Sequence, residues 1–328
     1  MSQQGAPVVV PAGAREGAAA AGLFGDRLAE AVKRRESQLV LGLDPNPAQL
    51  WPRSLELAGG ADGQSAPPAT RAARAVAAHC RLVIEAVAEH CVAVKPQLAW
   101  FERLGAPGWA ALSEVVQAAR DAGLLVIADA KRGDVDVTAV AYAEAFLGET
   151  ETPFGTVPGL GADALTVNPL LGSDSLEPFV KVARGSGAGL FILARTSNPG
   201  AADLQDRELA GGMTVSTHVA ALITSLGSAG IGDSGFSDIG AVIGATAPHR
   251  LERLREAMPH AVLLLPGVGV QGGQVKDLAA AFIPGRAGGL PSASRSIVGA
   301  HVAGGGSPEA AAKDAAARLR EVAWTVSG

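Results

Sequence analysis

A run of five apolar residues, 124–128, ends abruptly at Asp129 and is followed closely by Lys131 and Asp134. An unbroken apolar run of this length is typical of a strand buried on both faces of a parallel sheet. Residues two apart in a strand share a face, so Asp129 and Lys131 are expected to point the same way. This stretch therefore favours a fold built on a buried parallel sheet, with charged side chains at its carboxyl edge.

Charges gathered at the end of a buried strand are costly unless they are paired or used in chemistry. A functional site is one interpretation of Asp129, Lys131 and Asp134. A network of salt bridges in a loop is the other, because most surface charges have no further role. The stretch alone does not decide between the two.

Short apolar runs alternate with helical patterns along the rest of the chain. Residues 52–68 are rich in proline, glycine, alanine and serine and are expected to form a surface loop, and residues 148–161 have no assignable role. Helices are expected over residues 24–35, 69–90, 107–122, 138–147, 213–226, 248–258 and 308–326. Strands are expected over residues 39–43, 91–95, 124–128, 163–167, 189–194, 239–243, 261–265 and 289–294.

Eight short strands that alternate with helices predict an α/β fold, a (β/α)8 TIM barrel forming a single domain over residues 23–328. Residues 1–22 are expected to be a flexible tail. The alternative, a doubly wound sheet, is disfavoured because no Gly-x-Gly-x-x-Gly follows the first strand and no P-loop motif occurs. The eighth strand is the weakest assignment, since Pro291 cannot donate a backbone hydrogen bond.

Composition narrows the function classes. The chain has 328 residues with 48% hydrophobic content, and its net charge of −5 comes with scattered Lys and Arg. It therefore lacks the basic footprint of a nucleic-acid or anionic-membrane partner, and no segment has the length of a membrane span. Cys80 and Cys91 fit neither a zinc motif nor a disulfide framework, so a reduced, cytoplasmic protein is expected.

Glycine-rich backbone follows the seventh expected strand, and an arginine follows the eighth. Backbone N–H groups in such loops bind phosphate in barrel enzymes, and arginine offers a bidentate fork to phosphate oxygens. Glycines also serve ordinary turns, so the alternative of a plain connection stays open. The residues concerned are Gly267, Gly269, Gln271, Gly272 and Gly273, with Ser294 and Arg295 after the last strand.

Taken together, these residues resemble the orotidine 5′-phosphate decarboxylase family in its longer bacterial form. The resemblance runs from about residue 24 to residue 297 and touches nearly every strand end. Its Asp-x-Lys-x-x-Asp motif is shared with sister enzymes, whereas the combination with Lys95 and Ser197 is more specific. The residues that carry it are Asp129-Ala130-Lys131-Arg132-Gly133-Asp134, Leu43-Asp44 and Pro266-Gly267-Val268-Gly269.

The resemblance implies a decarboxylase that forms uridine monophosphate from orotidine 5′-monophosphate without a metal ion or cofactor. It implies that Lys131 delivers a proton to C6, that Asp129 lies against the substrate carboxylate, and that Lys95 joins the charged array. It also implies a homodimer in which Asp134 and Thr138 act across the interface in the partner's site.

The resemblance further implies how the rest of the substrate is held. Asp44 would bind a ribose hydroxyl, and Ser197 would hydrogen-bond the pyrimidine. Gln271 would bridge base and phosphate, while Arg295 and the backbone of Ser294 would hold the phosphate.

Two other functions stay open at this point. A sister sugar-phosphate lyase would keep the Asp-x-Lys-x-x-Asp motif but use a magnesium ion, which a cation at Lys95 would oppose. A catalytically silent barrel would only bind a nucleotide or a partner, yet such a binder has no use for so costly a charged array. Thr166 and Asn168, beside the fourth strand, are either substrate contacts or partners of backbone groups.

Overall fold

The computed structural model describes residues 22–59 and 65–328. The expected tail over residues 1–22 thus lies almost wholly outside the described residues. In the described part of the chain, no helix combines the length and the apolar character needed to cross a membrane.

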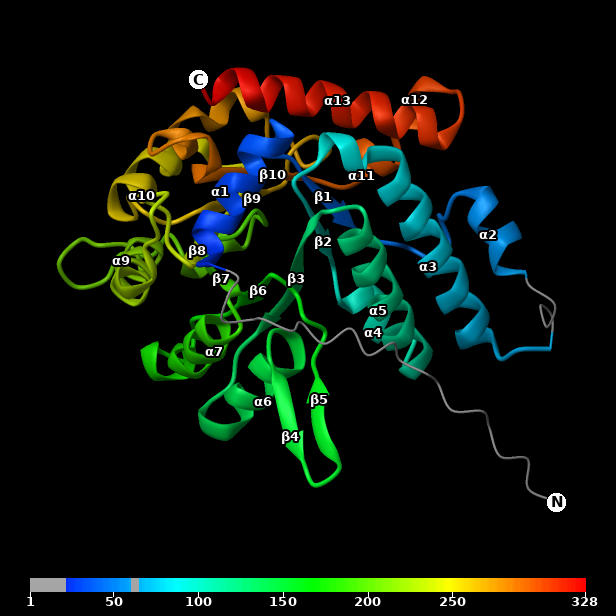
Figure 1. The fold of residues 1–328 in the computed structure, drawn as a ribbon. Helices are drawn as coiled ribbons and strands as arrows, with labels where there is room; N and C mark the ends of the chain where they lie inside the picture. The colour runs from blue at the N-terminus through cyan, green and yellow to red at the C-terminus, as the bar shows by residue number, and fades with distance from the viewer. Residues whose placement is uncertain (1–21, 60–64) are drawn as a thin grey trace.

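The core of the fold is a closed barrel of parallel strands (Figure 1). Its strands are β1 (Val40–Leu43), β2 (Ala93–Pro96), β3 (Leu125–Arg132), β6 (Ala164–Val167), β7 (Gly189–Arg195), β8 (Ile239–Ile243), β9 (Leu263–Pro266) and β10 (Gly289–Ala293). Within the described residues, these eight strands follow the spatial order β1-β10-β9-β8-β7-β6-β3-β2. The predicted (β/α)8 barrel is confirmed, and every predicted strand corresponds to one of its strands.

Helices surround the barrel, and α13 lies along the top of Figure 1. The longer ones are α1 (Phe24–Arg35), α3 (Pro68–Val87), α5 (Ala106–Asp121), α6 (Asp136–Phe146), α7 (Ser173–Gly185), α9 (Val215–Gly227) and α13 (Pro308–Val326). Shorter ones are α2 (Pro52–Ala58), α4 (Ala99–Glu102), α8 (Ala201–Leu204), α10 (Leu251–Ala257), α11 (Arg295–Val298) and α12 (Ala300–Gly304). The 3-10 turns are η2 (Ala88–His90), η3 (Ser228–Gly230), η4 (Pro248–Arg250), η5 (Val275–Phe282) and η6 (Arg286–Gly288).

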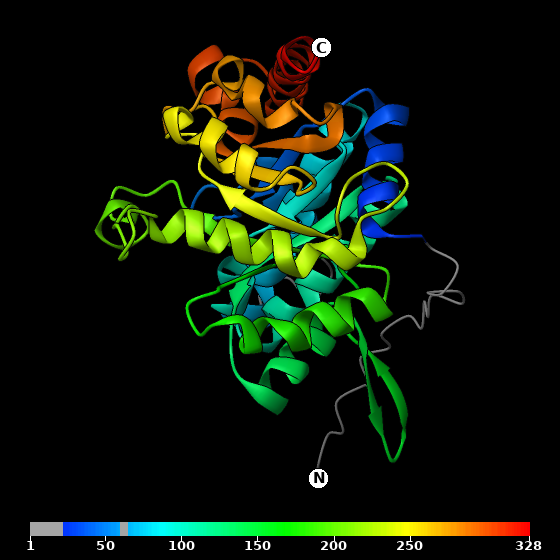
Figure 2. The ribbon, with the colours of Figure 1, turned by 90° about the vertical axis from the view of Figure 1, so that its left-hand side faces the viewer.

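The structure departs from the sequence prediction in several places. The short helices α4, α8, α11 and α12 were not predicted. The loop expected over residues 52–68 is wrong for its first part, because α2 begins at Pro52, where a missing N–H costs no helical hydrogen bond. Helix α7 was not expected and contains Pro178 in its first turns. The unassigned residues 148–161 contain the antiparallel hairpin β4 (Glu149–Thr152) and β5 (Gly155–Pro158), which projects from the barrel in both views (Figures 1 and 2).

Pro291 lies in strand β10, as the sequence prediction required. It pairs in register with Leu265 of β9, whereas the ladder between β10 and β1 contains only Ser292 and Ala293. Pro291 therefore precedes the β1 ladder, and an interior barrel strand can accommodate it.

Side chains alternate between two apolar layers along each barrel strand. Leu41, Val94 and Val126 belong to the layer between the strands and the outer helices. Their neighbours point inward and form a second layer that α1 closes at one end of the barrel. This inner layer includes Val40, Ala93, Ile127, Ala164, Phe191, Val242, Leu264 and Leu290, with Phe24 and Leu28 of α1.

Phe24 packs helix α1 against the barrel end. Its ring meets that of Phe191 edge-on, with centroids 5.9 Å apart. Gly189 allows this approach, since a Cβ there would lie 2.3 Å from the Phe24 ring. The barrel interior is thus sealed at the end opposite the charged residues in the carboxyl-terminal part of β3.

Replacing Phe24 by alanine should open a cavity at this seal, because the side chain is 2% exposed. We predict a loss of about 3–5 kcal/mol in the free energy of unfolding, measured by chemical denaturation. Phe154→Ala is the matched control, since Phe154 is 98% exposed at the hairpin tip, and it should change stability by less than about 0.5 kcal/mol. Equal effects of the two variants would contradict the sealing role of α1.

Candidate active site

A cavity of about 380 Å³ opens at the carboxyl ends of the barrel strands. The floor of the cavity is formed by strand residues. Each of them lies two positions after an apolar residue of the inner layer on the same strand. Because strand residues alternate, the position that follows an inward-facing apolar residue by two must also face inward. The floor residues are Gly42 of β1, Lys95 of β2, Asp129 of β3, Thr166 of β6 and Ser292 of β10.

Asp129 lies between two ammonium groups on this floor. Its Oδ2 accepts a hydrogen bond from Lys95 Nζ at 2.6 Å, and its Oδ1 accepts one from Lys131 Nζ at 2.5 Å. Asp129 and Lys95 are 6% and 7% exposed, whereas the Lys131 side chain is 43% exposed and so reaches toward the open cavity. The carboxylate is thereby held, while one of its two cations stays accessible to a ligand.

Each charge in this cluster alters the proton affinity of its neighbours. Burial raises the pKa of Asp129, but the charges and hydrogen bonds of Lys95 and Lys131 outweigh burial and hold that pKa well below its usual range. Burial likewise lowers the pKa of Lys95, and the charges of Asp129 and Asp44 outweigh it, so the net shift is upward. Asp129 is therefore an anion and Lys95 a cation at neutral pH.

Lys131 occupies an unusual backbone conformation. Its φ is +50°, in the left-handed region that costs a non-glycine residue about 1–2 kcal/mol. The pairing of β3 with β6 shifts register here, jumping from Ala128 to Arg132. The segment from Asp129 to Lys131 is therefore not a regular strand, and alternation does not explain the direction of the Lys131 side chain. Both side chains nevertheless line the cavity, as expected from the sequence.

The turn after Lys131 is held by Arg132. Its guanidinium forms an ion pair with Glu102 of α4 and donates to the Ala130 carbonyl at 3.0 Å. It also lies over the rings of Tyr142 and Phe146 in α6. Arg132 thus fixes the position of the segment that leads from the cavity to α6.

Asp134 and Thr138 do not line the cavity of their own chain. Asp134 is half-buried, and its carboxylate accepts the backbone N–H of Val135 at 2.8 Å. Thr138 is exposed in the first turn of α6. Val135 and Val137 beside them are 45% and 81% exposed, so this edge of the mouth presents apolar surface next to a carboxylate.

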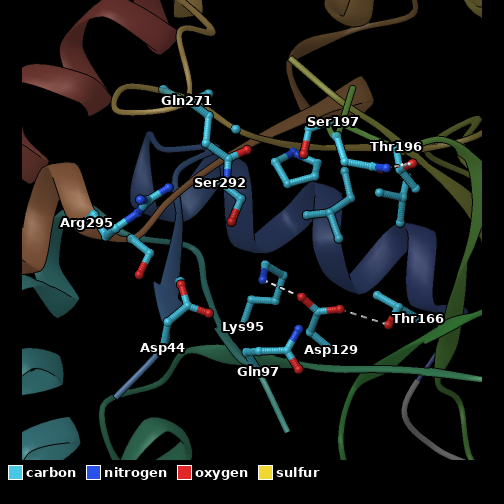
Figure 3. Close-up of a pocket in the computed structure, with 18 of the residues that line it drawn as sticks. Asp44, Lys95, Gln97, Asp129, Thr166, Thr196, Ser197, Gln271, Ser292 and Arg295 are labelled. Atoms are coloured by element: carbon cyan, nitrogen blue, oxygen red, sulfur yellow. Dashed lines mark hydrogen bonds and ion pairs between the residues drawn. The ribbon is translucent and has the colours of Figure 1, made fainter. Parts of the chain in front are cut away.

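The opposite side of the cavity is built by the loop after β9. Gly267, Gly269 and Gly272 have φ values of +99°, +86° and +96°, which glycine adopts without strain. Backbone hydrogen bonds from Gly273 N to Gly267 O and from Gly269 N to Gly273 O close this loop tightly. The side chain of Gln271 projects from it toward the cavity (Figure 3).

Ser294 and Arg295 complete this side from the end of β10. The guanidinium of Arg295 is exposed, and it makes no hydrogen bond or ion pair with any described residue. Figure 3 shows Arg295 and Gln271 across the pocket from Lys95 and Asp129. The cavity therefore has a charged cluster in its floor and a separate cation at its rim.

The loop after β7 forms a further wall. Thr196 N donates to Gln205 Oε1 at 2.7 Å, and the Thr196 hydroxyl donates to Asn198 Oδ1 at 2.6 Å. Ser197 packs against Gly244, where a Cβ would come within 2.6 Å of the Ser197 Cα. These contacts place the Ser197 side chain at the cavity.

Eight of the ten predicted site residues line one cavity. They are Asp44, Lys95, Asp129, Lys131, Ser197, Gln271, Ser294 and Arg295. Sequence reasoning missed Gln97, Thr196, Asn198 and Ser292, and left Thr166 undecided. Alternation could have indicated Ser292, two residues after the inward-facing Leu290, and Gln97, two residues after Lys95.

No group of three or more His, Cys, Asp or Glu residues within residues 22–59 and 65–328 has the arrangement of a metal site. Both oxygens of Asp129 already accept hydrogen bonds from ammonium groups. The charged cluster thus consists of one carboxylate and the two lysine ammonium groups that bind it.

Comparison with known proteins identifies the relatives of this chain. Residues 37–315 match the model of the "Orotidine 5'-phosphate decarboxylase / HUMPS family". Orotidine 5'-phosphate decarboxylase of Rhodopirellula baltica is 44% identical over 85% of this chain and 89% of its own length, and that of Deinococcus radiodurans is 48% identical over 73% and 81%. The solved structure of Leishmania donovani OMP decarboxylase is 33% identical, with a TM-score of 0.67 over 92% of this chain and 99% of that chain.

The lowered pKa of Asp129 should make the free energy of unfolding depend on pH in acid. Since the unfolded carboxyl titrates near about pH 3.9, the stabilisation that depends on the Asp129 charge is complete above that pH and is lost as pH falls toward the lower folded pKa. We predict that the difference in unfolding free energy between wild type and Asp129→Asn is constant from about pH 7 to 5 and declines below about pH 4, by at most ~1.4 kcal/mol per pH unit. A difference that grows in acid would show that the pKa is not lowered.

Proposed function

Because the chain belongs to the orotidine 5′-phosphate decarboxylase / HUMPS family, we propose that it converts orotidine 5′-monophosphate to uridine 5′-monophosphate and CO₂ in pyrimidine biosynthesis. The observation that carries this proposal is the buried Asp129 carboxylate held between Lys95 and Lys131 on the cavity floor. The activity is that of a carboxy-lyase, as in the relatives' name.

The arrangement of the cavity suits this substrate. Arg295 and the backbone of Ser294 hold the phosphate at the rim, with the glycine loop after β9 beside them. Gln271 bridges phosphate and base, and Ser197 hydrogen-bonds the pyrimidine. Asp44 is half-buried between rim and floor, and its carboxylate accepts a hydrogen bond from a ribose hydroxyl. This orientation directs C6 and its carboxylate toward Asp129 and Lys131.

The chemistry requires a cation at C6. When the bond from C6 to the carboxylate breaks, its electron pair remains on C6 in the plane of the ring, where the π-system cannot delocalise it. A preorganised ammonium group stabilises this developing charge. Lys131 supplies that group and then transfers a proton to C6, and the resulting amine regains a proton from water.

Lys95 and Asp129 keep Lys131 in place for this step. Asp129 accepts its hydrogen bond from Lys131 and lies where the substrate carboxylate enters, while Lys95 compensates the buried charge of Asp129. Binding of the remote phosphate offsets the cost of bringing two carboxylates together.

The alternative of a magnesium-dependent sugar-phosphate lyase is supported less well. A magnesium site there would need the carboxylate of Asp129, whose two oxygens both accept hydrogen bonds from lysines. A second cation beside Lys95 would be repelled. We therefore propose a reaction without metal ion or cofactor.

We further propose that the active form is a homodimer. Asp134 and Thr138 lie outside the cavity of their own chain, beside the exposed Val135 and Val137. In a two-fold dimer this edge of one subunit covers the mouth of the other, so that Asp134 and Thr138 complete the partner's site. A cytoplasmic location belongs to the same proposal, and the buried free thiols of Cys80 and Cys91 are compatible with it.

A first test follows the loss of orotidine 5′-monophosphate absorbance with purified protein, with and without a chelator. We predict activity that survives the chelator and falls by at least about 10³-fold in Lys131→Ala, because the charge at C6 is then lost. Lys276→Ala is the control, since Lys276 is exposed in η5, and it should retain wild-type activity. No activity in folded wild type would refute the proposed function, and sugar phosphates with magnesium would then be assayed.

A second test mixes two inactive variants, Lys131→Ala and Asp134→Ala, after dissociation and reassociation. If Asp134 acts across the interface, each mixed dimer has one intact site, so the mixture should regain about a quarter of wild-type activity. A mixture of Lys131→Ala with Lys95→Ala should regain none, because both lysines act within one subunit. No recovery in the first mixture would show that Asp134 does not act in trans.

A further inference from the structure

The hydroxyl of Thr166 connects the backbone of Lys131 to the carboxylate of Asp129. Lys131 N donates to Thr166 Oγ1 at 2.9 Å, and Thr166 Oγ1 lies 3.1 Å from Asp129 Oδ1. Figure 3 shows the bond between Thr166 and Asp129 on the cavity floor. Because an ionised carboxylate only accepts hydrogen bonds, the hydroxyl proton must point to Asp129, which leaves its lone pairs for the Lys131 N–H.

Thr166 stands at the irregular part of the β3–β6 ladder. Ala128 pairs with Leu165, and the next pair is Arg132 with Val167. Asp129, Ala130 and Lys131 therefore have no ladder partner in β6, the strand that carries Thr166. The Thr166 side chain replaces the ladder partner that the Lys131 N–H would otherwise have in β6.

We infer that Thr166 is a positioning residue that holds Lys131 in its left-handed conformation and sets the angle of the Asp129 carboxylate, so that Lys131 Nζ reaches the reacting carbon. The inference rests on the proposed function for its catalytic consequence. Thr166 is 1% exposed, so water cannot substitute for its hydroxyl without rearrangement. One hydroxyl thereby fixes both members of the ion pair that carries the chemistry.

Thr166→Val and Thr166→Ser separate the hydroxyl from the shape of the side chain. Valine keeps the volume and branching but lacks the hydrogen bonds, whereas serine keeps the hydroxyl. We expect kcat to fall by about 10²-fold in Thr166→Val, because small displacements of a reacting group have effects of this size. KM and the affinity for uridine 5′-monophosphate should change by less than about threefold, since the phosphate, ribose and base contacts remain. Thr166→Ser should recover most of kcat.

Thr214→Val is the matched control. Thr214 is also a buried threonine, and its hydroxyl caps α9 by accepting the N–H of Thr217 at 3.2 Å. This variant should lower thermal stability and leave kcat unchanged. A fall in kcat through loss of stability alone would appear in both variants, so the pair distinguishes positioning from folding.

A crystal structure of Thr166→Val supplies a readout that does not depend on turnover. The inference predicts that Lys131 leaves the region of positive φ or that its Nζ moves away from Asp129. An unchanged Lys131 with wild-type kcat would overturn the inference, as would a Thr166→Ser variant as impaired as Thr166→Val. If wild type itself does not decarboxylate the nucleotide, the proposed function fails, and the position of Lys131 in the variant structure still decides the role of Thr166.

Discussion

The structure of the site depends on one buried carboxylate. Asp129 has 6% of its surface exposed, and a lone ion in that position would destabilise the fold by several kcal/mol. Lys95 and Lys131 remove most of that penalty, each through a hydrogen bond to a different oxygen. Removing either lysine should destabilise the fold, because the buried carboxylate would then keep only one of its two cationic partners. The same contacts that make Asp129 tolerable also hold an ammonium group at the open side of the cavity.

The barrel makes such a cluster possible because its strands deliver inward-facing residues in layers. Helix α1 and the inner apolar layer, with Phe24 and Phe191, seal one end. One layer further along the strands, the inward positions become polar, and Lys95 and Asp129 meet from adjacent strands. Apolar packing beneath the floor keeps water away from the buried side of the ion pair, which strengthens its electrostatic interaction.

Much of the fold and of the candidate site could be predicted from the sequence. The parts that could not be predicted have physical reasons. Apolar runs of strand length predicted seven of the barrel strands, and the eighth, β10 with Pro291, was assigned as the weakest strand because the barrel pattern required one there. Both Asp129 and Lys131 line the cavity as expected, although Lys131 reaches it through an irregular segment and not by strand alternation. The left-handed conformation of Lys131 could not be foreseen, because it depends on a hydroxyl from β6 and not on a local glycine. For the same reason Thr166 stayed undecided, since its two partners lie on another strand. Asp134 and Thr138 act, in our proposal, on a second chain, so neither the sequence nor one subunit reveals their partners.

The proposed reaction requires a nucleotide bound in one orientation, which a crystal structure of the wild-type protein with uridine 5′-monophosphate would test most directly. We predict phosphate oxygens on Arg295 and the Ser294 backbone, the ring beside Ser197, and C6 within hydrogen-bond distance of Lys131 Nζ. A phosphate bound at Lys95 and Lys131, or a base turned away from Asp129, would contradict it.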